Sequence, residues 1–187
     1  MFKRLFARSA EADIAESLYR AAVTQARRPE FYVECGVPDT VDGRFELVAL
    51  HVFLVLHRLK GGGEATDRLG QAVFDLMFAD MDRNLREMGA GDLGVGPRVK
   101  SMARAFYGRI AAYQDGLAAG AGALDAALRR NLYGTIPSPD DTAVAAMADY
   151  LRGGVGRLVA SAMDDLMAGR ARFPEPPRIA PRPDPGQ

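Results

Sequence analysis

The chain has 187 residues, 48% of them hydrophobic, and its 24 Lys and Arg residues are balanced by 24 Asp and Glu residues. This composition excludes a disordered chain and a uniformly basic protein that binds nucleic acid through bulk positive charge. Cys35 is the only cysteine of the sequence, which excludes an internal disulfide and a cysteine-rich zinc site and indicates a reducing compartment. No apolar run is long enough to span a bilayer, and the N-terminus lacks a secretory signal, so we expect a cytoplasmic protein.

Helix-breaking residues divide the sequence into six helical segments, and no segment alternates polar and apolar residues as a strand does. The first helix follows Ser9, a predicted N-cap, and ends before Pro29. The second covers 44–60 and is apolar on nearly all sides, which predicts a place at the centre of a bundle. The third covers 64–88 and has the clearest helical period of apolar residues.

The remaining helices are delimited by Pro and Gly residues. Pro97 is placed to open the fourth helix, and Gly134 ends a shorter fifth segment. The sixth begins at Ser138 with a capping pattern and extends to about Gly169, and a glycine cluster over 153–156 is a candidate kink.

These segments predict an all-α fold with one domain, a bundle of about six helices. We expect a basic N-terminal extension over residues 1–9, the helical domain over 10–171 and a proline-rich, disordered tail over 172–187.

The motifs in this sequence that suggest catalysis lack the structural context that each of them needs. The run 89–94 matches the dinucleotide fingerprint G-x-G-x-x-G, but a helix precedes it where the fingerprint needs a strand. His51 and His57 are six residues apart, so they do not share a helix face and are better explained as core or boundary residues. Cys35 has no histidine partner in an obvious arrangement. The sequence therefore predicts no enzyme, no metal site and no cofactor.

A line of polar residues interrupts the apolar face of the third helix. Asp80, Asn84 and Glu87 are spaced i, i+4, i+7 and lie within the apolar arc. Because an unpaired buried polar group costs on the order of several kcal/mol, such a line is either hydrogen-bonded internally or left for a partner. Both interpretations stay open.

The fourth helix supplies basic residues and a tyrosine as further binding candidates. If the third and fourth helices form an antiparallel hairpin, Glu87 comes close to the start of the fourth helix, and part of the basic set shares one flank with the tyrosine. These candidates for client or partner binding are Arg98, Lys100, Arg104, Tyr107 and Arg109.

The reverse side of the fourth helix carries small residues. Either another helix packs close to it, or the stripe reflects a composition rich in alanine. The stripe consists of Ser101, Ala105, Gly108 and Ala112.

Several blocks of this sequence, in their order and spacing, resemble the ubiquinol-cytochrome c chaperone family. The resemblance covers about 14–150, and its blocks are 37–45, 50–56, 74–89, 91–93, 98–100 and 105–109.

The resemblance implies a non-enzymatic, all-helical assembly chaperone that binds newly made cytochrome b or an early intermediate of respiratory complex III. It also implies a small helical partner protein, work beside the membrane, and contact with nucleic acid only indirectly through the ribosome. The missing mitochondrial targeting extension fits a bacterial member. A helical bundle that binds a lipid or another small ligand is the alternative, motivated by an interior rich in Met and Phe.

The zero net charge is a cancellation between segments. Residues 1–28 carry six basic and three acidic groups, residues 169–187 carry four and two, and residues 29–168 carry 14 and 19. Basic ends of this kind favour peripheral contact with an anionic surface such as the inner membrane.

Overall fold

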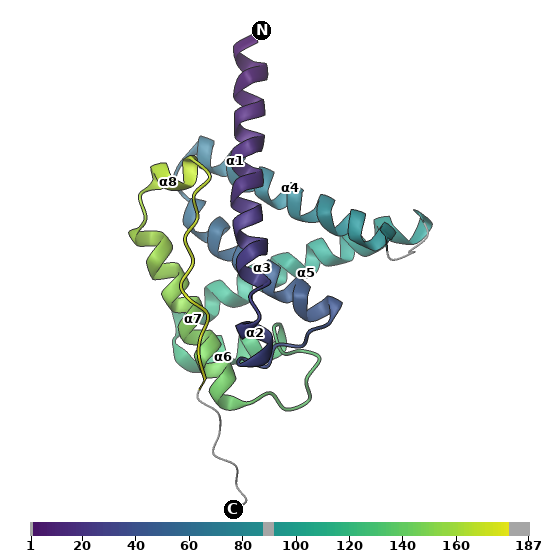
Figure 1. Ribbon diagram of the computed structural model, residues 1–187, viewed down its shortest axis with the longest axis vertical. Coiled ribbons are helices and arrows are strands. Elements are labelled where there is room, and N and C mark those ends of the chain that lie inside the picture. Colours follow the sequence, from purple (N-terminus) through teal and green to yellow (C-terminus); the bar gives the residue numbers. More distant parts are fainter. Residues whose placement is uncertain (1, 88–91, 180–187) are drawn as a thin grey trace, which may run out of the picture.

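The structure is a computed structural model that describes residues 2–87 and 92–179. Within these residues the fold is all-helical and forms one domain, as the sequence predicts, and six of the helices have seven or more residues. The helices, shown in Figure 1, are α1 (Phe2–Ala26), α2 (Glu30–Val33), α3 (Val41–Leu59), α4 (Glu64–Glu87), α5 (Asp92–Ala119), α6 (Ala121–Arg130), α7 (Asp141–Ala160) and α8 (Met163–Met167).

Some helix boundaries differ from the sequence prediction. α1 begins before Ser9, and α5 begins ahead of Pro97, which therefore lies inside the helix. The last predicted helix is split, because α7 ends at Ala160 and α8 follows as a separate single turn. α2 was not predicted, since four residues are too few to show a helical period.

α3 is the centre of the bundle, as its nearly continuous apolar sequence predicts. Leu47, Leu50 and Leu54 pack into one hydrophobic cluster with α6 and α7. Val52 and Val55, on the other side of the helix, belong to a second cluster with α1 and α4. A helix buried from both sides fixes the relative positions of all the others.

Gly154 serves close packing rather than the predicted kink. A Cβ atom at this position would lie 2.8 Å from Leu54 Cδ1, so the glycine lets α7 approach α3. α7 runs without interruption from Asp141 to Ala160. Its N-cap is Asp140, whose carboxylate accepts hydrogen bonds from the backbone N–H groups of Thr142 and Ala143.

α4 and α5 lie side by side and project from the bundle as an arm (Figure 1). Aromatic rings pack between the two helices: Phe74 lies 4.6 Å from Phe78, 5.8 Å from Phe106 and 5.3 Å from Tyr107 between ring centroids. The predicted hairpin is therefore a packed structural unit.

The chain from 170 to 179, here called the strap, has no helical structure and runs along the bundle as an extended segment (Figure 1). It is docked where the sequence predicted disorder from residue 172 onward. Gln25 Nε2 donates to Pro174 O at 2.9 Å, Ile179 N donates to Glu34 Oε2 at 3.1 Å, and Phe173 packs on the core. Proline suits this role because it fixes the extended backbone before docking and so lowers the entropy cost. Residues 180–187 lie outside the described part of the chain.

None of the helices in the described residues is both long and apolar enough to cross a membrane.

Candidate functional site

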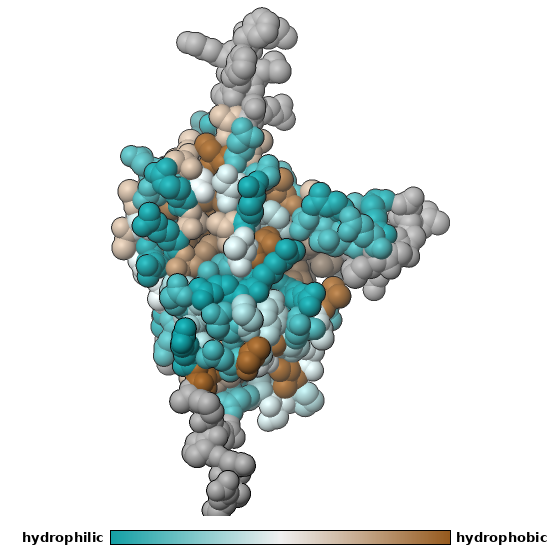
Figure 2. Space-filling model, viewed as in Figure 1, coloured by the Kyte–Doolittle hydropathy of each residue, from teal (hydrophilic) through white to brown (hydrophobic). Residues whose placement is uncertain are grey.

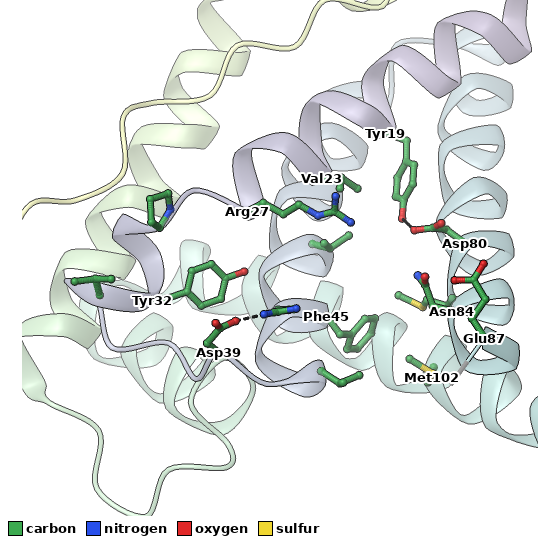
Figure 3. A pocket seen from close by; sticks show the side chains of 16 residues that line it. Tyr19, Val23, Arg27, Tyr32, Asp39, Phe45, Asp80, Asn84, Glu87 and Met102 are labelled. Atoms are coloured by element: carbon green, nitrogen blue, oxygen red, sulfur yellow. Dashed lines mark hydrogen bonds and ion pairs between the residues drawn. The ribbon is translucent and has the colours of Figure 1, made fainter. Parts of the chain in front are cut away.

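A groove with a volume of about 720 Å³ lies where α1, α2, α3 and α4 meet (Figure 3). It is open to solvent on one side, and residues from all four helices, from α5 and from the connecting loops line it. Figure 2 shows that the visible side of the arm is largely hydrophilic, while hydrophobic side chains reach the surface of the body below it. The groove combines apolar and charged groups in one concave surface, as ligand- and peptide-binding sites do.

The floor of the groove is apolar. It is made by Val23 of α1, Phe45 and Val48 of α3, Met81 of α4 and Met102 of α5. Met81 is only 8% exposed, Phe45, Val48 and Met102 are partly buried against the second core cluster, and Val23 is half-buried. Methionine side chains adapt to irregular partners, so a floor of this kind accepts apolar side chains of different shapes.

The α4 wall contains the predicted polar line. Tyr19 Oη donates a hydrogen bond to Asp80 Oδ2 at 2.9 Å, and the Arg83 guanidinium pairs with the same carboxylate. Burial, together with the Asp80 carboxylate, raises the pKa of Tyr19, so its hydroxyl stays a donor. Asn84 and Glu87 face the groove next to Asp80 (Figure 3), and neither side chain has a partner among the described residues. The line is therefore bonded internally at one end and open at the other.

The opposite wall comes from α1, α2 and α3. The Arg44 guanidinium binds Asp39 Oδ1 at 2.6 Å, and Tyr32 Oη donates to the Ala26 carbonyl at 3.0 Å. Arg27 points into the groove (Figure 3), and within the described chain its guanidinium has no carboxylate partner. Arg27 lies between Tyr19 and Tyr32 in Figure 3, and its positive charge opposes the rise in the pKa of both tyrosines.

The start of α3 positions one rim of the groove. Thr40 is the N-cap and accepts a hydrogen bond from Gly43 N at 3.2 Å. A Cβ atom at Gly43 would lie 2.0 Å from the Pro38 carbonyl oxygen, so only glycine lets the loop cross the first turn of the helix. This crossing leaves Val41 61% exposed beside the groove, and Val33 of α2 is 81% exposed at the same rim.

The fourth-helix candidates do not form one surface. Arg104 and Tyr107 are exposed on the arm, with Tyr107 57% exposed. The side chains of Arg98 and Lys100 lie outside the described part of the chain, and so does the predicted approach of Glu87 to them. Arg109 faces away from this flank, into the bundle.

Arg109 is a packing residue rather than an open binding group. Its Nε donates to Glu46 Oε2 at 2.6 Å, a second guanidinium nitrogen binds the other carboxylate oxygen, and its charge lies 5.2 Å from the centroid of the Phe45 ring. Burial raises the pKa of Glu46, and the Arg109 guanidinium opposes this rise. The pair therefore connects α5 to α3 directly behind the groove floor.

The small-residue stripe of the arm is not covered by a helix of the described chain. Ser101, Ala105 and Gly108 are exposed, and a Cβ atom at Gly108 would meet nothing within 4 Å. The expectation of a closely packed helix at this stripe is therefore wrong for these three positions.

The side chains of His51 and Cys35 are structural. His51 is fully buried and hydrogen-bonded at both ring nitrogens. The Cys35 thiol is buried and donates to the Pro177 carbonyl at 3.8 Å, and burial raises its pKa to about 12. Within residues 2–87 and 92–179, no three His, Cys, Asp or Glu residues form a group that could hold a metal ion.

A comparison with protein families shows which family the chain belongs to. The ubiquinol-cytochrome C chaperone model matches residues 33–173. The chain belongs to the ubiquinol-cytochrome c chaperone family. The resemblance seen in the sequence is thereby confirmed, and the match covers α3, α4 and α5, which supply most of the floor and one wall of the groove.

Relatives and a solved structure agree with this membership. A ubiquinol-cytochrome-c reductase complex assembly factor 1 from Xenopus laevis is 30% identical over 115 residues, which cover 62% of this chain and 58% of that protein. The corresponding mouse protein is 26% identical over 157 residues, 83% of this chain and 53% of its own length. The chain thus spans little more than half the length of these relatives. The crystal structure of a Cbp3 homolog from Brucella abortus has 38% identity and a TM-score of 0.81, and covers 94% of this chain and 97% of that chain.

Proposed function

We propose that this member of the chaperone family assists the assembly of ubiquinol-cytochrome c reductase, respiratory complex III. Its client is newly made cytochrome b or an early assembly intermediate that contains it. Family membership and the names of the relatives, which are assembly factors of this enzyme, support the complex. The choice of cytochrome b rests on the family resemblance of the sequence.

The open groove is the observation that carries a holding function. It offers apolar side chains on its floor, exposed Val33 and Val41 at its rim and polar groups without partners on its walls. Such a combination suits a protein segment with one apolar face, because the apolar face buries area while the polar walls fix its orientation. The chaperone acts in this proposal by binding and release, without a covalent step.

The geometry favours this function over the alternative of a lipid- or small-ligand-binding bundle. An enclosed apolar cavity would surround a small ligand on most sides, whereas this groove is open along one side and exposes valines at its rim. In the same proposal the exposed arm flank of Arg104 and Tyr107 is available to a small helical partner protein, and the basic N-terminal segment to the membrane surface.

Site-specific photo-crosslinking in living cells tests the client and the groove together. A benzophenone amino acid replaces Val33 at the groove rim and, as a matched control, the exposed Val159 of α7, which is 60% exposed and outside the groove. We expect a crosslink to cytochrome b from position 33 and none from position 159. Equal crosslinking from both positions, or no cytochrome b product together with normal b-haem spectra in a deletion strain, would contradict the proposal.

A further inference from the structure

The two walls of the groove carry opposite charges. On the α4 wall the charge of Asp80 is neutralised by Arg83, which leaves the Glu87 carboxylate as the uncompensated charge, with the Asn84 amide beside it. Glu87 also acts on the Arg83 guanidinium from the same helix. In the described chain this wall is therefore negative and can accept hydrogen bonds.

On the facing wall the pattern is reversed. Arg44 is neutralised by Asp39, which leaves the Arg27 guanidinium as the uncompensated charge. Tyr32 does not offer its hydroxyl proton to a ligand, because it donates to the Ala26 carbonyl. Among the described residues this wall is therefore positive and donates hydrogen bonds.

We infer that the groove receives an amphipathic helical segment of a partner protein with three distinct sides. Its apolar side packs on Phe45, Val48 and Met81. A Lys or Arg on one flank binds Glu87 and Asn84, and an Asp or Glu on the other flank binds Arg27. This inference rests on the proposed function and specifies the chemistry of the segment that the chaperone holds.

Charge complementarity is the argument for this occupant. Opposite charges on facing walls reject a segment with one sign of charge on both flanks, because one of its flanks then meets a like charge. A lipid headgroup at Arg27 would leave Glu87 unpaired and would find no enclosed space for its acyl chains between the walls. A helix with oppositely charged flanks satisfies both walls at once, and an amphipathic helix in an apolar groove is a common mode of peptide recognition.

The test uses the full chain and synthetic helical peptides of about five turns. The peptides share one Leu- and Val-rich face and differ in their flanks, which carry Lys and Glu, Lys only, Glu only, or Gln only. Fluorescence anisotropy measures binding to the wild type and to Arg27→Glu, Glu87→Lys and the double variant. Arg157→Glu in α7 and Asp115→Lys in α5, both exposed positions outside the groove, are matched controls, and Arg104→Glu probes the arm. Far-UV circular dichroism checks that all variants are folded.

The wild type is expected to bind the Lys/Glu peptide about fivefold more tightly than the other three. Each single charge reversal weakens this binding by about fivefold, and the double variant restores it, because the same peptide turned end to end meets the exchanged charges. The controls leave the affinity unchanged, and raised salt reduces the differences among the peptides.

Three results would overturn the inference: equal affinity for all four peptides, additive loss in the double variant, or loss of binding in Arg104→Glu alone, which would move the site to the arm. Sedimentation with phosphatidylglycerol vesicles that depends on Arg27 without peptide binding would assign the groove to lipid and also overturn it. The proposed function fails separately, through the absence of cytochrome b from the Val33 crosslink together with normal b-haem spectra in a deletion strain. A positive peptide result with a negative crosslink would identify a groove for a different client.

Discussion

Two clusters of polar side chains lie among apolar residues in this bundle, and they differ in how many of their polar groups are hydrogen-bonded within the protein. Around His51, in what we call the histidine network, both ring nitrogens and the Tyr150 hydroxyl are hydrogen-bonded. The ring Nδ1 donates to the Leu47 carbonyl at 2.7 Å, so Nε2 accepts from the Tyr150 hydroxyl at 2.8 Å. Gln25 Nε2 in turn donates to the Tyr150 oxygen at 3.0 Å. On the groove wall, by contrast, Asp80 is bonded but Asn84 and Glu87 are open.

The difference separates a structural polar cluster from one available for binding. The histidine network is closed by aromatic rings, with Phe31 and Phe173 at centroid distances of 5.4 Å and 5.2 Å from His51. No ligand can reach it without unfolding the surroundings. The groove wall also sets polar groups beside apolar ones but faces solvent, so its unsatisfied groups cost little in the free protein and gain a partner on binding.

The largest effect on stability is expected when the ion pair between Glu46 and Arg109, which lies behind the groove floor, is broken. We expect Arg109→Met to lower the free energy of unfolding by about 3 kcal/mol, because the Glu46 carboxylate is then left buried without its cation. Urea unfolding followed by circular dichroism measures the change. The double variant Glu46→Gln with Arg109→Met should recover most of the loss, and an equal loss in both would show that the charge pair is unimportant.

Acid should destabilise the histidine network selectively. Burial lowers the pKa of His51 to about 4, while an unfolded histidine titrates near 6.5. Between these values the unfolded chain binds the extra proton, so stability falls as the pH falls, by about 2 kcal/mol from this residue at pH 5. The raised pKa of Glu46 acts in the opposite direction, so the informative quantity is the difference between wild type and His51→Gln in chemical unfolding at pH 7 and pH 5. A similar pH dependence in both proteins would contradict the assignment.

Removing one hydroxyl from the histidine network should lower the free energy of unfolding more than removing one amide from the groove. Tyr150→Phe leaves His51 Nε2 and the Gln25 amide short of a partner, and we expect a loss of about 1 to 2 kcal/mol in the free energy of unfolding. Asn84→Ala is the comparison, and it should change the same quantity by less than about 0.5 kcal/mol. The contrast between the clusters fails if the two variants lose equal stability.

The smallest effect on stability is expected at Glu87. Glu87→Gln keeps the size of the side chain and removes an exposed charge without a partner in the described chain, so thermal unfolding should shift by less than one degree or so. Its client crosslink from position 33 should nevertheless weaken. A variant that keeps wild-type crosslinking would show that the open end of the polar line is ordinary solvated surface.

The sequence predicts the helices that have a clear period or a clear stop. The apolar run of α3, the Gly-rich turn before α4 and the capping pattern before α7 have local causes, and all three helices are found. α2 was not predicted, because one turn is too short to show a helical period. The docking of the strap was not predicted, because an extended segment is held by contacts with residues that are far away in the sequence. Gly154 was interpreted as a kink, since sequence alone does not show which helix lies opposite.

The candidate site was predicted from one side only. Asp80, Asn84 and Glu87 were found as an interruption of a regular face, and that signal is local to one helix. Arg27 stands at the end of the first predicted helix, just before Pro29, and Val33 lies between that helix and the one predicted over 44–60, so the opposite wall was missed. Arg109 was grouped with the exposed basic residues because its partner Glu46 is 63 positions away. The exposed position of Val33 and Val41 depends on tertiary packing and has no sequence signal.

The strap also has a consequence for the order in which the protein is made. Its hydrogen bonds join Gln25 to Pro174 and Glu34 to Ile179, pairs separated by 149 and 145 positions. A nascent chain in which residues 170–179 are still inside the ribosome lacks these contacts, although α1 and α3 are already complete. Contacts of such high sequence separation are closed late, since loop closure must precede them. The single turn α2, which borders the groove, thus gains its last contacts only after residues 170–179 have been made, and a chain without them has an incomplete support for this side of the binding surface.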